Sequence, residues 1–321
     1  MPGTPPDQIR VIFSNFELDG RGDEQKLAAF YRLLRAHDPH LVGRAEFLAG
    51  PGNGQRRLLD AEAALTPEGR PWLRLRGFIG AQAVGEFRTA AFVRTDVFTP
   101  VSAGSIGDPT GCPPTCVTLR LTPYPGDPDC FRELTFTAAH HSYASPPARA
   151  LEAQELTRLA DRRDPRDRTA RYPNGRPREA LLTLDTNSYP EPGLPGDVPI
   201  PRPADIQDRT HLTHRFTPTG TGEWVPDTTS DRTLRAAGLQ DVARHLTENG
   251  RTGVLAPTTP GYADQGGERR ACRIDRAYAS DGILTAVEDF TVVDCAGLSD
   301  HHALLITLSR RRLAETLSLT A

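Results

Sequence analysis

The sequence predicts a mixed α/β fold in which strands and strand hairpins alternate with amphipathic helices. Short β-rich runs recur along the chain, and several alternate apolar and polar residues as strands with one buried face do. Amphipathic helical stretches separate some of these runs. The runs show no constant period, which excludes a repeat architecture. An α+β or layered α/β arrangement with mixed sheets follows from these observations.

The predicted strands are short apolar runs with turn residues near their ends. Many place alternate side chains on one face, so each can bury that face against a core. They are IRVIFSNF from Ile9, HLVGRAEF from His40, AAFVRTDVF from Ala90, CVTLRLTPY from Cys116, ELTFTAAHH from Glu133, EALLTLDTN from Glu179, CRIDRAYAS from Cys272, VEDFTVVDC from Val287 and HHALLITLS from His301.

Amphipathic helices are predicted between several of these strands. In the first of them Leu27, Tyr31 and Leu34 share one stripe, and Asp23 is placed to cap the N-terminus. The predicted helices cover Glu24 to Ala36, Gln55 to Leu65, Ala148 to Ala160 and a broken pair within Thr233 to Leu246.

The length of 321 residues permits one large α/β domain or two ordinary ones. Residues 161–178 are rich in arginine with interleaved aspartates, and residues 190–231 are dense in Pro, Gly, Asp and Thr. Strand-like runs with polar ends lie on both sides of each stretch, so we interpret both as long surface loops rather than linkers. We therefore expect one catalytic domain over residues 7–310, with tails at 1–6 and 311–321.

The charge pattern argues against a general polyanion binder. The net charge is −3, and the basic residues are almost all arginine because Lys26 is the only lysine. No stretch approaches the roughly 20 apolar residues that cross a bilayer. The first twenty residues lack the features of a secretory signal, so we expect a cytoplasmic protein without a membrane span. The sequence leaves the oligomeric state open.

Five cysteines lack the paired spacing of a zinc site and are interpreted as free thiols: Cys112, Cys116, Cys130, Cys272 and Cys295. Cys272 and Cys295 flank a predicted turn near Asp281 and Gly282, so a disulfide between them is the alternative.

Polar residues follow several predicted strands, where a sheet can direct them into one cleft. Asn15 ends the first strand and Glu46 ends the second, although a turn-forming Asn and a solvated Glu are the alternatives. In LLTLDTNSYP, Asp185 and Asn187 leave a strand on the same face, with an Asx turn as the alternative.

Two more strands carry a carboxylate and histidines. Asp275 lies inside CRIDRAYAS, where an unpaired carboxylate is costly to bury. In GLSDHHALLITL, Asp300 and His301 precede an apolar strand, and a carboxylate held against an imidazole fixes its tautomer and orientation. His140 ends another strand, and a surface pair with His141 is the alternative.

In chain order these residues form the series N, E, H, D-x-N, R-I-D and S-D-H. This series resembles the endonuclease/exonuclease/phosphatase superfamily, which includes pancreatic-type deoxyribonucleases, apurinic endonucleases, inositol polyphosphate phosphatases and bacterial sphingomyelinases. The resemblance covers residues 10–309 and suggests an actinobacterial-type member. It departs from the family where Ala45 precedes Glu46, and where Leu184 and Thr186 flank Asp185. The reactive groups themselves are retained.

The resemblance implies a four-layer α/β sandwich, with two mixed sheets packed face to face and helices outside. It implies a metal-dependent phosphoric ester hydrolase in which Glu46 binds Mg²⁺, with Mn²⁺ as the alternative cation, and Asn15 and Asp300 lie in or near the coordination sphere. Asp185 and His301, the latter oriented by Asp275, are the two candidates for handling the nucleophilic water. Asn187 and His140 would donate to the phosphoryl oxygens.

Three alternatives remain at this point. A nuclease acting on DNA or RNA is less favoured than a hydrolase of a small, lipid-like or short nucleotide ester, because no basic stripe is evident. A binding module that keeps the fold without turnover would have lost a metal carboxylate or the Asp-His pair. A zinc site at His211 and His214 needs a helix in a segment rich in Pro and Thr.

Overall fold

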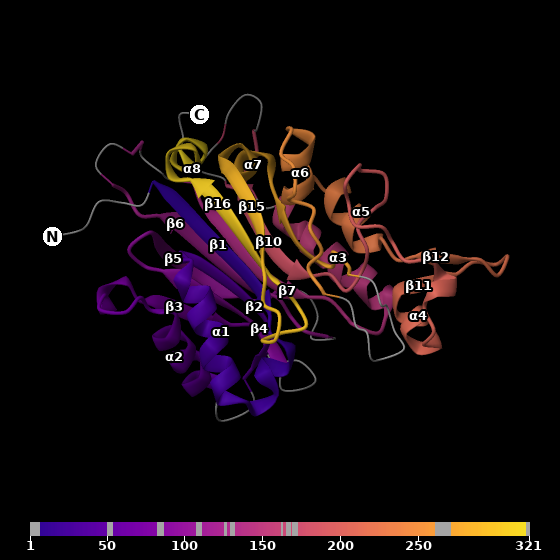
Figure 1. Cartoon of the computed structure of the whole chain (residues 1–321). Coiled ribbons are helices and arrows are strands. Elements are labelled where there is room, and N and C mark those ends of the chain that lie inside the picture. Colours follow the sequence, from indigo (N-terminus) through magenta and orange to yellow (C-terminus); the bar gives the residue numbers. More distant parts are fainter. Residues whose placement is uncertain are drawn as a thin grey trace.

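The computed structural model describes residues 7–49, 54–81, 87–106, 111–124, 127–128, 132–161, 163–164, 168, 173–260 and 271–318. Two six-stranded mixed sheets pack face to face with helices on their outer faces (Figure 1), which confirms the predicted four-layer sandwich. The first sheet has the order β15 (Val287–Val293), β16 (Ala303–Ser309), β1 (Gln8–Asn15), β2 (Leu41–Leu48), β4 (Phe87–Arg94) and β3 (Leu75–Ile79). The second has the order β13 (Gln240–Asp241), β14 (Asp275–Ala279), β10 (Glu179–Asp185), β7 (Leu134–His140), β6 (Thr115–Leu121) and β5 (Phe98–Gly104).

The helices and the minor strands complete the architecture. The helices are α1 (Glu24–Ala36), α2 (Gly54–Leu65), α3 (Pro146–Asp161), α4 (Arg209–Arg215), α5 (Thr229–Ala236), α6 (Val242–Glu248), α7 (Asp281–Ala286) and α8 (Arg310–Leu317). Two small hairpins pair β8 (Arg163–Asp164) with β9 (Arg176–Pro177), and β11 (Phe216–Pro218) with β12 (Trp224–Pro226). The second hairpin and α4 project away from the sheets (Figure 1).

The two sheets share one pattern of pairing. Each contains a central parallel pair, β1 with β2 in the first sheet and β7 with β10 in the second, flanked by antiparallel neighbours. The carboxyl ends of parallel strands meet at one edge of a sheet, and an antiparallel neighbour begins at that edge. Because the sheets lie face to face, polar residues at these ends can converge on one cleft.

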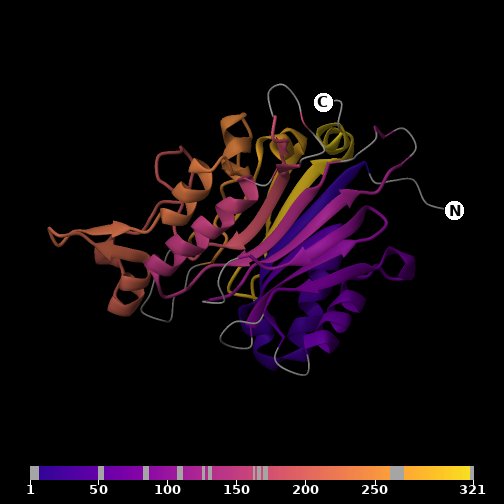
Figure 2. The ribbon, with the colours of Figure 1, turned by 180° about the vertical axis from the view of Figure 1, so that it is seen from behind.

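Alternation along the strands divides the apolar residues between layers. In β1, Ile9, Val11 and Phe13 enter the core between the two sheets, whereas Ile12 packs under α1 and α2. In β10, Leu181 faces the central core and Leu182 faces the outer layer of α3 and α5. Figure 2, seen from behind, shows α3 along the outer face of the second sheet.

Gly43 permits a close approach of the sheets near the site. A Cβ added to Gly43 would lie 2.6 Å from Thr183 Oγ1 on β10 and 3.2 Å from the Ala138 side chain on β7. No side chain fits at that separation without a shift of the opposing strands. The glycine thus holds β2 and Glu46 against the second sheet.

The helix predictions hold at α1, α2, α3 and the α5–α6 pair, while three other segments differ from expectation. The predicted C-terminal tail from residue 311 is wrong for its first part, because Leu313, Ala314 and Leu317 of α8 are buried in the core. α4 forms within the segment predicted to be irregular, with Asp208 capping it through Thr210 N. The predicted turn near Asp281 is helix α7.

The alternative of a disulfide between Cys272 and Cys295 is excluded, because both are free thiols. Cys130 lies outside the described residues. Within the described part of the chain, no helix is long and apolar enough to cross a membrane.

Candidate active site

The strand ends bring the predicted site residues of both sheets together. On β10, Asp185 is opposite His140 of β7 on one side and Asp275 of β14 on the other. Asn15 ends β1 in the facing sheet, and its side chain crosses to Asp185. The parallel pair in each sheet thus delivers its C-terminal polar residue to the same place.

Asn15 links the two sheets at the centre of the site. Its Nδ2 donates to Asp185 Oδ2 at 3.0 Å and to Glu46 Oε1 at 3.2 Å. Asn15 and Asp185 are almost fully buried, whereas 19% of the Glu46 side chain is exposed. This geometry leaves the Glu46 carboxylate at the boundary between the buried site and solvent.

The backbone at Glu46 adopts a conformation that is rare for a residue with a side chain. Its φ is +50°, and the β2–β4 register shifts between Arg44 and Phe47. Such a left-handed residue costs about 1–2 kcal/mol relative to ordinary backbone, and bulges of this kind redirect side chains next to active sites. Here the bulge turns Glu46 toward Asn15, and Leu18 N donates to Glu46 Oε2 at 2.6 Å. Strained backbone of this kind is common at functional sites.

Asp275 and His301 form a buried acid–imidazole pair. His301 Nδ1 lies 2.7 Å from Asp275 Oδ2, and His301 Nε2 lies 3.9 Å from Asp185 Oδ2. Burial raises the pKa of Asp275 to about 6. Burial opposes charge on His301, but Asp275 and Asp185 outweigh it and raise the pKa of His301 to about 10. At neutral pH the proton therefore resides on His301, and the pair is an imidazolium held by a carboxylate.

Thr258 fixes the start of β14 and hence the position of Asp275. Its Oγ1 accepts from Asp275 N at 3.0 Å and from Ile274 N at 3.1 Å. Thr258 is fully buried. The carboxylate is thus held in place through its own backbone.

Asn187 takes part in five hydrogen bonds within the described residues and also has a left-handed backbone, with φ +48°. Its N–H donates to Asp185 Oδ1 at 2.8 Å, and its Nδ2 donates to the His141 carbonyl at 3.0 Å. Arg215, from the end of α4, donates through one guanidinium nitrogen to the Asn187 carbonyl and to Asn187 Oδ1, the latter at 3.0 Å. These contacts fix which end of the amide is the donor.

Two opposing effects act on the pKa of His140. Burial lowers its pKa, but Cys112, Asp185 and Glu46 together raise it to about 10. Its Nε2 lies 3.6 Å from Asp185 Oδ2 and 3.2 Å from Asn187 Nδ2. Because the Asn187 amide is fixed as a donor, a hydrogen bond to Nε2 requires neutral His140 with its proton on Nδ1. The fixed amide favours the neutral form, and the neighbouring carboxylates favour the charged one.

Asp300 lies apart from the central contacts of the site. Its Oδ1 lies 3.3 Å from Ser299 Oγ, which donates to the Asn15 carbonyl at 3.0 Å and accepts from His301 N at 3.2 Å. Asp300 is partly exposed beside the buried Ser299. It thus contacts the site through Ser299 and contributes negative charge near His301.

The donor atoms suit a hard divalent cation. Asn15 Oδ1 is buried and, among the described residues, has no hydrogen-bond partner, so it is an amide oxygen free to ligate next to Glu46 Oε1. Asp185, Asp275 and His301 form a second cluster whose ligand atoms lie within 4.8 Å of one another. In that cluster His301 Nδ1 and Asp275 Oδ2 are already paired with each other, whereas Glu46 and Asn15 offer oxygen atoms alone, which a hard cation prefers.

Sequence reasoning missed the residues that hold the reactive groups in place. These are Ser299, Thr258 and Arg215. Ser299 stands in the S-D-H motif, directly before Asp300, and could have been singled out there. Thr258 reaches the site from a loop and Arg215 from the end of α4, and no local sequence pattern marks either residue.

Comparison with known proteins bears on the family and the fold of the chain. The model of the Endonuclease/Exonuclease/phosphatase family matches residues 13–301. No match is found among curated proteins. Among solved structures, a Bacteroides thetaiotaomicron endonuclease/exonuclease/phosphatase family protein aligns with TM-score 0.56 at 17% identity, over 94% of both chains.

Two further solved structures share the fold. An AP endonuclease from Archaeoglobus fulgidus aligns with TM-score 0.56 at 12% identity, over 94% of this chain and 99% of that one. Truncated Caenorhabditis elegans TDP2 aligns with TM-score 0.53 at 16% identity, over 94% and 97%. Identities this low show the fold alone, whereas the family model spans most of the chain. The chain belongs to the Endonuclease/Exonuclease/phosphatase family, whose members are metal-dependent phosphoric ester hydrolases.

Proposed function

We propose that this protein is a magnesium-dependent hydrolase of a small or lipid-like organic phosphate ester or a short nucleotide. One observation carries the proposal: polar groups of the two sheets meet within hydrogen-bond distance or just beyond. Asn15 and Glu46 of the first sheet, and His301 next to β16 of that sheet, face Asp185 and Asp275 of the second. Each group has a role in phosphoryl transfer, and no reactive group of the series is replaced. This completeness argues against a binding module without turnover.

Glu46 and the free Oδ1 of Asn15 would hold Mg²⁺, with Asp300 nearby through Ser299. When bound, the cation stabilises negative charge that develops on the phosphate and its leaving oxygen. Carboxylate and amide oxygens favour Mg²⁺ or Mn²⁺ over zinc, which prefers nitrogen and sulfur ligands.

Asp185 is placed to orient the attacking water. Burial alone would raise its pKa, but His301, His140, Arg215 and the Asn187 N–H hold the pKa of Asp185 below its ordinary value. It therefore accepts a hydrogen bond as a carboxylate at neutral pH.

His301 is suited to stabilising the phosphoryl group, because Asp275 keeps it protonated and its Nε2 points toward Asp185. The fixed Asn187 amide would be a second donor where a phosphoryl oxygen replaces His140 Nε2 as the acceptor of its second N–H. His140, beside that amide, is the third group that can face a phosphoryl oxygen. These donors would act on charge that grows in the transition state, which is where they accelerate the reaction.

The charge of the chain supports a small substrate. The net charge is −3, and the buried Arg149 is paired with Asp227. A protein that binds long duplexes usually presents a basic stripe. A nuclease is the second candidate, because one similar structure is that of D. rerio TDP2 complexed with single strand DNA product, aligned at 14% identity with TM-score 0.54.

The test compares hydrolysis of para-nitrophenyl phosphodiesters, phosphoinositides, single-stranded oligonucleotides and plasmid DNA, at two salt concentrations with Mg²⁺. We expect hydrolysis of small esters that EDTA abolishes and Mg²⁺ or Mn²⁺ restores. Glu46→Gln should be inactive, and Glu68→Gln, at an exposed glutamate on a loop, should be fully active. Full activity after exhaustive EDTA treatment would refute the metal-dependent mechanism. Efficient, salt-sensitive nicking of plasmid DNA without hydrolysis of the small esters would refute the proposed substrate class and favour a nuclease.

A further inference from the structure

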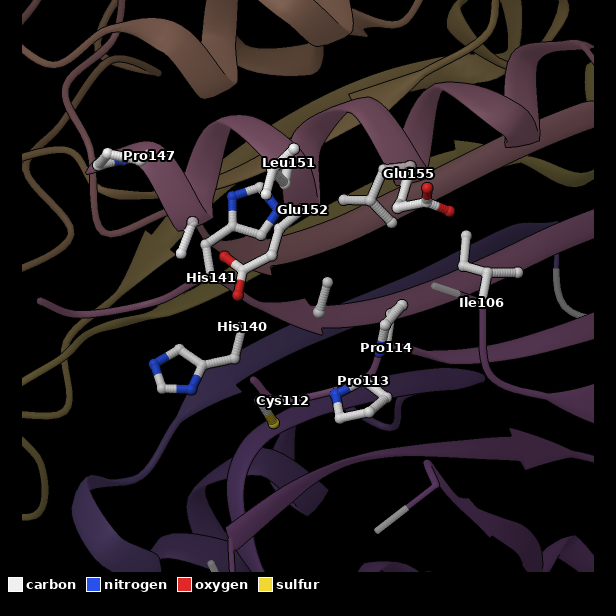
Figure 3. Close-up of a pocket in the computed structure, with 13 residues that line it drawn as sticks. Ile106, Cys112, Pro113, Pro114, His140, His141, Pro147, Leu151, Glu152 and Glu155 are labelled. Carbon is white, nitrogen blue, oxygen red and sulfur yellow. The ribbon is translucent and has the colours of Figure 1, made fainter. Parts of the chain in front are cut away.

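A cavity of about 600 Å³ opens beside the proposed phosphoryl site, between α3 and the C-terminal end of β7 (Figure 3). Its volume lies within the range of pockets that hold small organic ligands. Most of its lining is apolar, and the apolar side chains are Ile106, Pro113, Pro114, Ala139, Pro147, Ala148, Leu151 and Leu156.

The cavity shares residues with the site. His140 lines it and also contacts Asn187, and Cys112 lines it and raises the pKa of His140 through a hydrogen bond. Figure 3 shows the His140 ring at one end of the cavity, near Cys112. A molecule whose phosphate lies between Asn187 and Asp185 therefore has this cavity directly next to it.

The charges in the cavity exclude a second phosphate. No arginine or lysine is among the described lining residues, whose charged groups are the carboxylates of Glu152 and Glu155 on α3 and, at the end next to the site, His140. Glu152 Oε2 accepts from Ser142 N at 2.7 Å, and burial raises the pKa of Glu152. An anion bound in the cavity away from His140 would meet the partly buried carboxylate of Glu152, and the charge of His140 is already offset by Asp185 and Glu46. Binding of a second phosphate is therefore unfavourable at low dielectric.

We propose that this cavity binds the apolar organic group of the phosphate ester, an alkyl chain or an aromatic ring without negative charge. This assignment rests on the proposed function and narrows its substrate class to esters with an apolar organic group. Burial of alkyl or aryl surface against the proline, leucine and alanine side chains supplies binding energy remote from the phosphate. A polynucleotide strand would bring a further phosphate toward Glu152, so the cavity selects against it.

Leu151 allows the cavity to be altered without disturbing the core. It lies on α3 with 65% of its surface exposed and still lines the cavity. Leu151→Glu places a third carboxylate at the rim. Leu59 of α2 is a matched control, because it is also a helix leucine, is 47% exposed and does not line the cavity.

The experiment measures kcat/KM with Mg²⁺ for three para-nitrophenyl phosphodiesters whose second ester group is methyl, phenyl or carboxyethyl. We expect the wild type to prefer phenyl over methyl by roughly tenfold or more and to disfavour carboxyethyl. Leu151→Glu should reduce the phenyl-to-methyl preference by roughly tenfold. Leu59→Glu should leave both the preference and the activity unchanged.

A second readout does not depend on turnover. Nile red, a neutral fluorophore that brightens in apolar surroundings, should bind the wild type saturably and be displaced by phenyl phosphate. Leu151→Glu and Ala148→Trp should weaken this binding, and Leu59→Glu should not. Unaltered preference and unaltered Nile red binding in Leu151→Glu, with ester hydrolysis intact, would overturn the cavity assignment alone. Absence of hydrolysis of every ester would refute the proposed function and the assignment together.

Discussion

Arg215 offers the most specific test of how this site is built. It reaches the site from the end of α4, and its guanidinium donates to both the carbonyl and Oδ1 of Asn187. It is almost fully buried. Arg215→Met keeps the length and apolar stem of the side chain and removes these donors, so the Asn187 amide loses the partner that fixes its orientation.

The size of the effect follows from what Asn187 does. A hydrogen bond from a charged donor contributes about 1.5–3 kcal/mol, which corresponds to roughly 10- to 150-fold in rate if it is felt only in the transition state. Complete loss of one oxyanion donor costs roughly 10²–10³ in kcat and sets the upper limit. We therefore expect Arg215→Met to lower kcat by roughly 10- to 100-fold with little change in KM. Arg215→Lys should recover part of the loss.

A double-mutant cycle separates orientation from general damage to the protein. If Arg215 acts through Asn187, then Arg215→Met added to Asn187→Ala should cause almost no further loss of kcat. Arg202→Met, at an exposed arginine of the same segment that pairs with Asp205, should match the wild type. Thermal unfolding checks that each variant is folded at the assay temperature. Fully additive losses in the double variant, or wild-type kcat in Arg215→Met, would refute the orienting role.

The remaining predictions concern the metal ligand, the acid–imidazole pair and acid stability. Glu46→Gln should lower kcat by roughly a hundredfold or more at saturating Mg²⁺ without lowering the Tm, and an active Glu46→Gln would remove it as a ligand. Asp275→Asn should cost roughly 10- to 100-fold in kcat, because a neutral amide cannot stabilise charged His301; near wild-type turnover would contradict this. Burial, with Arg94 and Arg10, lowers the pKa of His40 from 6.5 to about 2, so its stabilising contribution is present above pH 6.5 and lost as the pH falls below it. Each pH unit below 6.5 should lower the free energy of unfolding by about 1.4 kcal/mol through this group. Denaturant unfolding of His40→Asn at several pH values should show a slope of the free energy of unfolding against pH that is smaller by the contribution of one proton. An unchanged slope would show that His40 does not titrate on unfolding.

The fold could be predicted where the sequence pattern is local. The stripe of Leu27, Tyr31 and Leu34 with the Asp23 cap gives α1 with the expected bounds, because capping and periodicity act within a few residues. Strand order could not be read in this way. The pairing of β1 with β16 joins residues nearly 300 positions apart, and the sequence analysis did not predict it.

The predicted C-terminal tail fails for a related reason. α8 carries three consecutive arginines, Arg310 to Arg312, and this charge resembles a solvated end. Leu313 and Leu317 are four residues apart, so they share one helix face and pack into the central core. A short helix with a narrow apolar stripe needs a partner surface to be recognised, and the sequence does not display that surface.

The candidate reactive groups of the site could be predicted from the sequence, but the residues that hold them in position could not. Asp185 and Asn187 sit at a strand end, where alternation along the strand shows which face they share. Arg215 lies 28 residues beyond Asn187 in a segment that predicted only loop, and its role depends on how α4 folds back. A positioning residue of this kind is set by tertiary structure alone.

At Glu46 the backbone adopts a conformation that the local sequence does not favour. A glutamate at φ +50° within a strand contradicts backbone preference, and glycine would adopt that conformation without strain. The structure retains the glutamate because the bulge is what turns its carboxylate toward Asn15 at the solvent boundary. Asn15 Oδ1 and Asp275 Oδ1 are likewise buried without hydrogen-bond partners among the described residues. The strained backbone at Glu46 and the unsatisfied oxygens of Asn15 and Asp275 are destabilising, and the proposed cation and phosphate would provide partners close to these oxygens.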